Sequence, residues 1–489
     1  MQRQEESGED IVIVGAGLAG LAAALGLHRK GVRSVVLESS PSLRASGFAF
    51  ATWPNAFRAL DALGVGDQIR KLHLHIQGLR VMSASTGEIA KEVDFRDEFS
   101  CVRRDVLLQV LAAELPTGTI RYSSKIVSID EHGDGAKTLH LADGSTLRAK
   151  VLVGCDGINS MVGRWLGLAK PSHSGRSATR GLARYPDGHG FPPKFLQLFG
   201  NGFRFGFVPC NDTDVYWFYT WSPSEDDDDG AEESGTKMKQ YVLTKLRSSK
   251  VPAEALELVE RSDDAPATPL RFRPPLSLVF AGISKGNVCV AGDALHPMTP
   301  DLGQGGCSAL EDGVILARCL GDAVLGRKAG TEKERIESGL REYAGMRRWR
   351  SVQLAGAAYM VGFVQQSDNA IVSFLREKVL AGALARSLVK RAALCAGEVA
   401  PQPPDAMCAQ PFDWIQSKKK RIAPCSLSSS SGSPVRGSAA PRLLSPPVVI
   451  GPRPRRSSLS PPDPALADRP RRRSPPSPVF LVAAGSRPR

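Results

Sequence analysis

An apolar run, a glycine-rich turn and an alanine-rich stretch follow one another in IVIVGAGLAGLAAALGLHRKG, residues 11–31. A second apolar run, SVVLE, occupies residues 34–38. The two runs predict buried strands, and the stretch between them predicts a helix that ends at Gly31. Strand, tight turn, helix and strand make a βαβ unit, which predicts an α/β fold with a doubly wound, Rossmann-like parallel sheet.

The turn of this unit has the pattern G-x-G-x-x-G at Gly15, Gly17 and Gly20. The first glycine permits the tight turn, the second lets the backbone approach a pyrophosphate, and the third lets helix and strand pack closely. Glu38 ends the second strand, where a carboxylate can accept hydrogen bonds from both ribose hydroxyls. A 2'-phosphate is disfavoured there because two anions would meet. The pattern by itself does not distinguish NAD from FAD.

The parallel sheet is expected to resume late in the chain. After Gly286 the apolar run NVCVAGD suits the same sheet, whereas aromatic residues alternate from Phe195 to Trp221 and predict two antiparallel strands. We therefore expect a discontinuous coenzyme domain at 9–180 and 281–330 that includes a hairpin at 78–93, an inserted mixed or antiparallel substrate-domain sheet at 181–280, helices at 331–414 and a tail at 415–489. Within these domains, helices are expected at 105–115, 308–325, 332–350 and over much of 352–396.

The basic charge of the chain belongs to its tail. The whole chain has a formal net charge of +13, and residues 415–489 contain 15 Lys and Arg against 2 Asp and Glu, so the preceding part is neutral. A neutral body gives no basis for nucleic-acid binding. The tail also has 15 prolines, and we expect it to be disordered because it cannot bury enough apolar surface. It can be read as an inert or artefactual extension or as a basic localisation segment.

Cysteine usage and the N-terminus bear on the cellular compartment. The nine cysteines are scattered without a CxxC pair, which favours a reducing compartment and argues against a zinc site. No targeting peptide is visible before the first strand, so we expect a cytoplasmic protein. The longest uncharged run, 351–367, is interrupted by glutamines, which disfavours a transmembrane segment but leaves peripheral membrane contact open. The sequence does not determine the oligomeric state.

Three further segments carry a family resemblance. GNVCVAGDALHPMTPDLGQGGCSALEDG (286–313), VLVGCDGINSMVGRWLG (151–167) and CVRRDVLLQVL (101–111) occur in order with GAGLAG. Together they resemble the FAD-dependent aromatic-hydroxylase type (class A) of flavoprotein monooxygenase. The segment HPMTPDLGQGGCSALED is most similar to the plant members of this family. The resemblance extends over roughly residues 10–400. It implies FAD as cofactor, NADPH or NADH as reductant, O2 as co-substrate, and a small, planar or aromatic organic substrate oxygenated through a flavin C4a-hydroperoxide.

The resemblance also assigns residues of the strand-to-helix junction. It places Asp293 against the ribityl chain and pyrophosphate of FAD, where a carboxylate can accept hydroxyl protons. It places Pro300 beside the flavin ring and the glycines Gly303, Gly305 and Gly306 at the start of a helix. Backbone N–H groups there, with the helix dipole, would stabilise negative charge at flavin N1 and the C2 carbonyl.

Four further residues have both a cofactor-binding and an ordinary structural interpretation. In the family, the CDG motif serves FAD and transient NAD(P)H binding, but Asp156 could be a plain turn residue. The family's flavin-contacting arginine corresponds to Arg104 rather than Arg103, and Arg44 lies where the family often has an arginine that reaches the cofactor; both could be surface side chains. His296 is near the flavin in the family and is a possible acid or base, although we favour a scaffold role.

The sequence departs from the family pattern at one position, and it leaves open the role of the aromatic strands and two alternative functions. Cys307 occupies the position of an asparagine in many relatives, so a side-chain hydrogen bond to the flavin is lost while backbone contacts survive. The aromatic strands could wall the substrate pocket, but such alternation is also typical of sheet packing. A flavin oxidase or dehydrogenase, and a non-catalytic flavin-binding interaction protein, remain as alternative functions.

Overall fold

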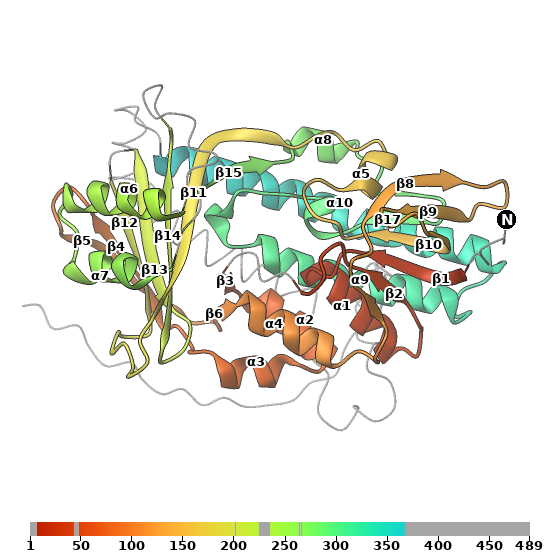
Figure 1. Ribbon diagram of the computed structural model, residues 1–489, viewed down its shortest axis with the longest axis horizontal. Coiled ribbons are helices and arrows are strands. Elements are labelled where there is room, and N and C mark those ends of the chain that lie inside the picture. The colour runs from red at the N-terminus through yellow and green to blue at the C-terminus, as the bar shows by residue number, and fades with distance from the viewer. Residues whose placement is uncertain are drawn as a thin grey trace, which may run out of the picture. The chain divides into compact units, whose positions relative to one another are not determined.

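The first strand lies at the centre of a parallel sheet (Figure 1). The computed structural model describes residues 7–43, 48–200, 202–223, 235–263, 265 and 267–366. β1 (Ser7–Val14) pairs in parallel with β2 (Val35–Leu37) on one side and β10 (Thr146–Gly154) on the other. β7 (Ile120–Arg121) extends the sheet beyond β2, and β17 (Val288–Val290) extends it beyond β10. The chain therefore returns to this sheet at residue 288.

The remaining strands of this eight-stranded sheet are antiparallel. β8 (Ile126–Glu131) and β9 (Lys137–Leu141) form a hairpin that pairs with β10, and β16 (Ser284–Lys285) pairs with β17. A separate two-stranded sheet joins β3 (Ala49–Thr52) to β6 (Ser100–Arg103). The coenzyme sheet is therefore mixed, with its parallel core formed by the strands that carry the sequence motifs.

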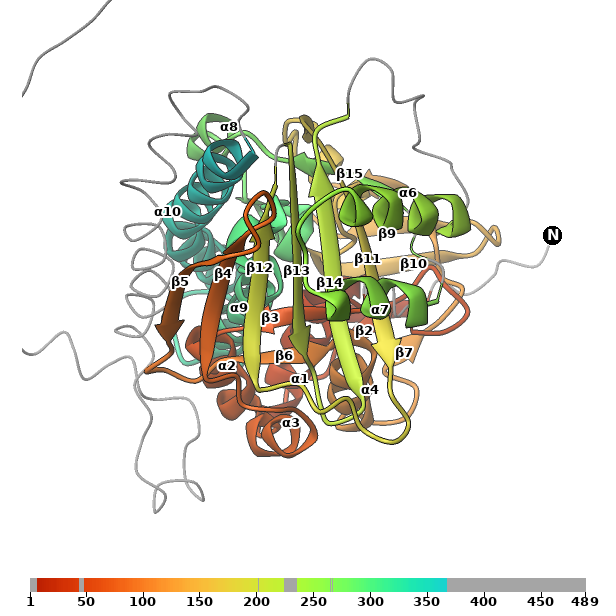
Figure 2. The same ribbon diagram turned by 90° about the vertical axis from the view of Figure 1, so that its left-hand side faces the viewer.

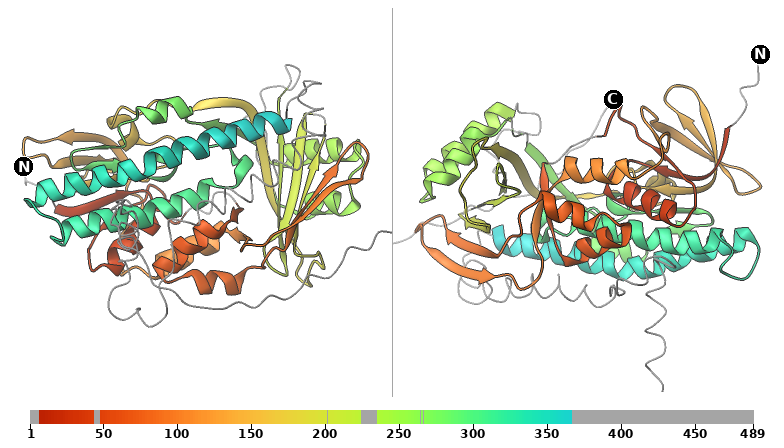
Figure 3. Two further views of the ribbon diagram at one scale, coloured as in Figure 1. Left: turned by 180° about the vertical axis from the view of Figure 1, so that it is seen from behind. Right: turned by 90° about the horizontal axis from the view of Figure 1, so that it is seen from below.

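The two long helices α9 (Gly305–Val324) and α10 (Glu332–Gln366) cover one face of the coenzyme sheet (Figure 3). The shorter helix α1 (Leu18–Arg29) packs against α9 through small residues: a Cβ at Gly313 would lie 2.5 Å from the Cβ of Ala22. α10 lies alongside α9, as both views of Figure 3 show. The sequence predicted separate helices at 332–350 and from 352, whereas one helix continues through both stretches; the rest of the predicted segment, from 367, lies outside the described residues.

Five shorter helices complete the coenzyme part: α2 (Pro54–Leu63), α3 (Gly66–Leu72), α4 (Arg104–Ala113), α5 (Met161–Trp165) and α8 (Pro275–Val279). None of the described helices has the length and apolar character needed to span a bilayer. Two short 3-10 turns, η2 (Gly292–Ala294) and η3 (Pro300–Leu302), lie between β17 and α9. We call residues 288–306 the junction.

The second sheet has seven strands and extends beyond its predicted boundaries (Figure 2). In spatial order they are β15 (Ala267–Phe272), β11 (Ser172–Arg184), β14 (Asp214–Trp221), β13 (Phe203–Pro209), β12 (Lys194–Phe199), β4 (Gly78–Ser83) and β5 (Ile89–Asp94). The hairpin at 78–93, expected in the coenzyme domain, belongs to this sheet because β4 pairs in parallel with β12. β11 likewise begins at residue 172 rather than 181. Backbone pairing between distant segments leaves no local pattern, so the sequence did not show it.

The two faces of the second sheet have different partners. On one face Phe205, Trp217 and Tyr219 pack in a core with α6 (Gly235–Arg247) and α7 (Ala253–Arg261), which lie over that face in Figure 2. On the other face Tyr216 and Phe218 join the core of the coenzyme part. Successive side chains of a strand point to opposite faces, so the aromatic alternation serves both purposes that the sequence left open: packing on one side and a cavity wall on the other.

Candidate active site

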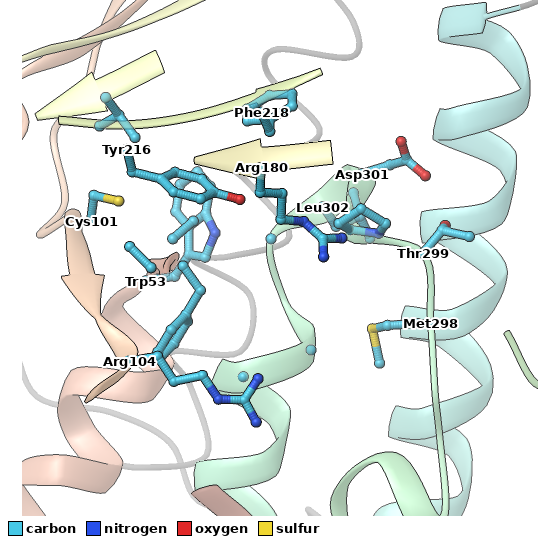
Figure 4. A pocket seen from close by; sticks show the side chains of 18 of the residues that line it. Trp53, Cys101, Arg104, Arg180, Tyr216, Phe218, Met298, Thr299, Asp301 and Leu302 are labelled. Carbon is cyan, nitrogen blue, oxygen red and sulfur yellow. The ribbon is translucent and has the colours of Figure 1, made fainter. Parts of the chain in front are cut away.

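A cavity of about 370 Å³ lies between the coenzyme sheet and the second sheet (Figure 4). One wall comes from the glycine turn after β1, from the junction and from the start of α9. The other wall comes from the inner face of the second sheet and includes Arg180, Tyr216 and Phe218. The carboxyl ends of β1, β10 and β17 all face this cavity, and ligands of open α/β sheets bind at the carboxyl ends of the strands.

The three glycines of the turn have distinct steric roles. Gly15 has φ +101°, and a Cβ there would lie 2.5 Å from the Cys155 carbonyl oxygen. A Cβ at Gly20 would lie 2.0 Å from the Gly15 carbonyl oxygen, so this position needs glycine for helix packing. A Cβ at Gly17, by contrast, would meet nothing within 4 Å, and Gly17 lines the cavity. The open space at Gly17, beside the start of α1, fits a pyrophosphate.

Glu38 is buried at the end of β2 and fastened to the glycine turn. It accepts hydrogen bonds from the Ala16 and Ser40 amides, both at 2.9 Å. Ser39 Oγ donates a further hydrogen bond to it at 3.3 Å, and its place at the end of β2 beside the glycine turn is compatible with the ribose role predicted for it. Arg44, the other residue predicted on this side, lies outside the described residues.

Arg104 and Asp293 meet at the cavity, whereas Arg103 is held elsewhere. Arg103 forms ion pairs with Asp105 at 2.5 Å and Asp214 at 2.8 Å. The neighbouring Arg104 lines the cavity with Asp293, whose carboxylate is exposed to it. Burial lowers the pKa of Arg104, and the charge of Asp293 opposes that shift. Of the two adjacent arginines, only Arg104 lines the cavity.

The junction glycines shape the side of the cavity at the start of α9. Gly303 has φ +62°, and a Cβ there would lie 2.8 Å from the Ala51 Cβ. A Cβ at Gly306 would lie 2.7 Å from the Phe50 ring, whereas Gly305 has only Met298 Cγ, at 3.8 Å, nearby. These glycines let β3 approach the start of α9, and they line the cavity together with Pro300. The first turn of α9 has no side-chain cap among the described residues, so its amides and dipole can act on a ligand in the cavity.

His296 lies in a buried charge network outside the cavity lining. Its Nε2 is 2.6 Å from Asp312 Oδ2, and Asp312 also accepts hydrogen bonds from the Gly292 amide and from Arg347 Nε. Burial raises the pKa of Asp312, but His296 and Arg347 outweigh it and bring the pKa to about 2. This arrangement supports the scaffold interpretation of His296. The sequence analysis missed Asp312 and Arg347, whose pairing no local pattern indicates.

Asp156 caps a helix. Its carboxylate accepts hydrogen bonds from Ser160 Oγ at 2.5 Å and from the Met161 amide at 2.6 Å, at the start of α5. Burial raises its pKa, and these hydrogen bonds oppose the shift. Its neighbours Cys155 and Gly157 line the cavity, but Asp156 does not. The geometry therefore favours the structural interpretation of this aspartate, while the motif as a whole borders the ligand space.

Cys307 turns away from the cavity. Its thiol is buried and donates a hydrogen bond to the Ala51 carbonyl at 3.3 Å, and burial raises its pKa to about 12. The residue thus packs β3 against α9 and gives the cavity no side-chain donor, as the sequence indicated.

An ion triad that the sequence did not reveal joins the junction to the second sheet. Asp301 accepts two hydrogen bonds from Arg176, at 3.0 and 2.8 Å, and lies 3.4 Å from Arg204. All three side chains are buried. Burial raises the pKa of Asp301, but the two arginines lower it below its ordinary value. The triad holds the two walls of the cavity together.

A Rossmann-like sheet, an open glycine turn and an uncapped helix start around one cavity define a dinucleotide-binding protein. The comparisons agree: residues 9–338 match the family described as FAD binding domain. The chain is 48% identical over 412 residues to Monooxygenase 2 of Arabidopsis thaliana, covering 81% of this chain and 100% of that protein. It is 36% identical over 378 residues to Monooxygenase 1 of the same plant, covering 75% and 93%.

Among solved structures, Klebsiella pneumoniae HpxO complexed with FAD and uric acid has a TM-score of 0.68 at 20% identity, covering 81% of this chain and 98% of that one. This likeness confirms the predicted α/β fold. The chain belongs to the FAD-dependent monooxygenases of the FAD binding domain family, which are oxidoreductases of the aromatic-hydroxylase type. The family resemblance found in the sequence is thereby confirmed.

Proposed function

We propose that this FAD-dependent monooxygenase uses NADPH or NADH and O2 to insert one oxygen atom into a small, planar organic substrate. The observation that carries the proposal is the cavity itself. Several of the residues predicted to hold the flavin, among them Gly17, Arg104 and Asp293, line one continuous space with the inner face of the second sheet. A cofactor on the first wall would face a substrate on the second.

The residues present fit FAD in this space. Open backbone at Gly17 and the start of α1 would hold the pyrophosphate, and Glu38 the ribose. Asp293 would accept hydrogen bonds from the ribityl hydroxyls, with Arg104 balancing its charge. The amides at the start of α9 would face the pyrimidine side of the ring. When bound, FAD supplies the electron transfer and oxygen activation, chemistry that protein side chains do not provide.

The second wall would exclude water from the reaction. Its apolar side chains include Phe95, Phe195, Val208 and Phe218, and they close the cavity opposite the junction. A dry, aromatic-lined space suits a flat ring and keeps water away from reactive intermediates of the reaction. The Klebsiella neighbour holds uric acid, a planar heterocycle, and so supports this shape of substrate.

Anaerobic and aerobic turnover assays test the proposal. Purified protein should contain FAD, oxidise NADPH or NADH, and incorporate one atom of ¹⁸O2 into a product when a metabolite panel is added. Stoichiometric hydrogen peroxide with every added compound would identify an oxidase instead. Protein that takes up FAD but oxidises no nicotinamide nucleotide would be a non-catalytic flavin-binding protein.

A further inference from the structure

The short helix α8 exposes two large apolar side chains. Leu276 is 78% exposed and Phe280, directly after the last turn, is 87% exposed, the highest values among the large apolar side chains of the described residues. The two residues are four positions apart, so they project from the same side of the helix. Leu278, between them, is buried and attaches the opposite side to the body of the protein. We call Leu276 and Phe280 the apolar tip.

The helix that carries the apolar tip is fixed on α10. A Cβ at Gly356 of α10 would lie 3.5 Å from Pro275 Cγ, so the two helices are in contact. Arg348 of α10 donates hydrogen bonds at 3.2, 2.8 and 2.8 Å to three carbonyls at the end of α8, those of Leu278, Val279 and Ala281. The apolar tip is therefore presented to the outside by a fixed element, and its exposure is a property of the fold.

The two segments around the apolar tip are basic. Residues 157–171 and 265–286 contain no aspartate or glutamate. They contain five cationic side chains, which we call the basic flank: Arg164, Lys170, Arg271, Arg273 and Lys285. Three of these side chains, Arg164, Lys170 and Lys285, are exposed. This concentration of positive charge contrasts with the neutral balance of the chain before its basic tail.

The fold brings the basic flank together at α5, next to α8. A Cβ at Gly282 would lie 3.4 Å from the carbonyl oxygen at the end of α5, and Figure 1 shows the two helices side by side. The three arginines of the flank and Lys170 line one cavity of about 320 Å³. Lys285 Nζ lies 5.0 Å from the centre of the Trp165 ring of α5. Glu131 lies near Lys285, but it pairs with Lys137 at 3.1 Å, so the net charge of this surface stays positive.

Beyond the proposed function, we propose that α8 docks the protein on a lipid bilayer that has anionic headgroups. The apolar tip enters the boundary between headgroups and acyl chains, and the basic flank contacts the headgroups. The occupant follows from charge complementarity, because an apolar tip beside cations and without carboxylates matches an anionic bilayer. The sequence left peripheral membrane contact open for residues 351–367, and α8 packs on this stretch through Gly356.

Vesicle co-sedimentation of the full-length protein tests the role of the apolar tip. Wild-type protein should bind vesicles of phosphatidylcholine mixed with phosphatidylserine more tightly than vesicles of phosphatidylcholine alone. Leu276→Ser/Phe280→Ser should bind the mixed vesicles at least about tenfold more weakly, because two apolar side chains no longer leave water. Its melting temperature should be unchanged, since both side chains are exposed. Ile89→Ser, which changes a 52% exposed side chain on β5, is the control and should bind as the wild type does.

A second pair of variants tests the role of charge. Lys170→Gln/Lys285→Gln should weaken binding to the mixed vesicles by about fivefold for each lysine and leave binding to phosphatidylcholine unchanged. Lys71→Gln/Lys91→Gln is the matched control, because it removes the same charge from exposed positions on α3 and β5. The control should keep the wild-type affinity for both kinds of vesicle.

Fluorescence quenching reports insertion at α8 separately from any binding by the basic tail, 415–489. Phe280→Trp adds an indole at the apolar tip, and Ile89→Trp adds one on β5. Each is compared with the wild-type protein, which contains six tryptophans, on mixed vesicles whose acyl chains carry bromine. The added fluorescence of Phe280→Trp should be quenched, because the indole contacts the acyl chains, and that of Ile89→Trp should not.

Absence of quenching in Phe280→Trp, or equal quenching in both tryptophan variants, would overturn the inference whatever the tail contributes. Wild-type protein that binds neither kind of vesicle would also overturn it, as would wild-type affinity of Leu276→Ser/Phe280→Ser. Dimerisation of the wild-type protein without lipid that this double variant abolishes would assign the surface to a second copy of the chain instead. None of these measurements involves turnover, so they are independent of whether the protein oxidises a nicotinamide nucleotide.

Discussion

Asp301 in the junction and Arg176 on β11 form a buried, two-bond ion pair although 125 residues separate them in the chain. The pair connects the wall that would hold the cofactor to the wall that would hold the substrate. A Cβ at Gly362 of α10 would lie 2.3 Å from Asp301 Oδ2, so α10 packs directly on it. The relative position of the two cavity walls therefore depends on an electrostatic contact as well as on apolar packing.

Removal of one partner of this pair should destabilise the protein strongly. Arg176→Met removes both hydrogen bonds that Arg176 donates to the buried Asp301 and leaves the 3.4 Å contact to Arg204, so we expect the free energy of unfolding to fall by about 3 kcal/mol. Urea denaturation measures the change. Arg247→Met is the control, because Arg247 pairs with Glu260 on the surface and such pairs contribute at most about 1 kcal/mol. Equal small effects of the two variants would contradict a stabilising role for the triad.

Asp293→Ala should fold normally and lose affinity for FAD. The exposed carboxylate is a candidate acceptor for ribityl hydroxyls, and loss of a charge-assisted hydrogen bond costs about 1.5 to 3 kcal/mol, or roughly 10- to 150-fold in Kd. Titration of the apoprotein with FAD measures it. Asp187 is an exposed aspartate in the turn after β11, and Asp187→Ala should bind FAD as the wild type does. Unchanged affinity of Asp293→Ala would refute the assignment.

Two glycine substitutions should separate cofactor binding from folding. Gly17 has φ −79° and open space around it, so Gly17→Val should fold yet block the pyrophosphate and purify without flavin. Gly20→Ala should instead lower the melting temperature, because its Cβ would clash with the Gly15 carbonyl oxygen. Flavin content and thermal unfolding are measured for both. A flavin-containing Gly17→Val protein would contradict the predicted role of the turn.

Stability should fall in acid partly through Asp312. Its folded-state pKa of about 2 lies below the ordinary value of 3.8, so its carboxylate stabilises the fold above about pH 4. This contribution, about 2 kcal/mol, should be lost as the pH falls from about 4 to 2. Unfolding free energies measured across this range should decline less steeply in Asp312→Asn than in the wild type, whereas Asp187→Asn should show the wild-type slope.

Truncation after Trp414 should leave the enzyme intact. The basic tail, 415–489, lies outside the described residues, and its 15 prolines and like charges argue against a packed core. FAD content, NADPH oxidation and melting temperature of the truncated protein should match those of the full chain. Loss of FAD or a large drop in melting temperature would show that the tail docks on the body.

The sequence by itself determined the elements whose information is local. The spacing of Gly15, Gly17 and Gly20 between two apolar runs predicts a βαβ unit because turn geometry and helix packing act over a few residues. The junction motif likewise indicated the return strand and the helix after it, and together these motifs identified the family. The β13–β14 hairpin was also predicted, because alternation along one strand is a local signal.

Only the tertiary structure decided which distant residues meet. Nothing near Arg180 or Tyr216 marks them as cavity residues, and nothing near Arg176 marks it as the partner of Asp301. These side chains reach the junction because β11 and β14 pair in one register and the triad fixes the sheet against Asp301. The hairpin at 78–93 joined the second sheet for the same reason. Strand pairing and buried ion pairs depend on groups that are far apart in the chain, and their energies appear only after folding has brought those groups together.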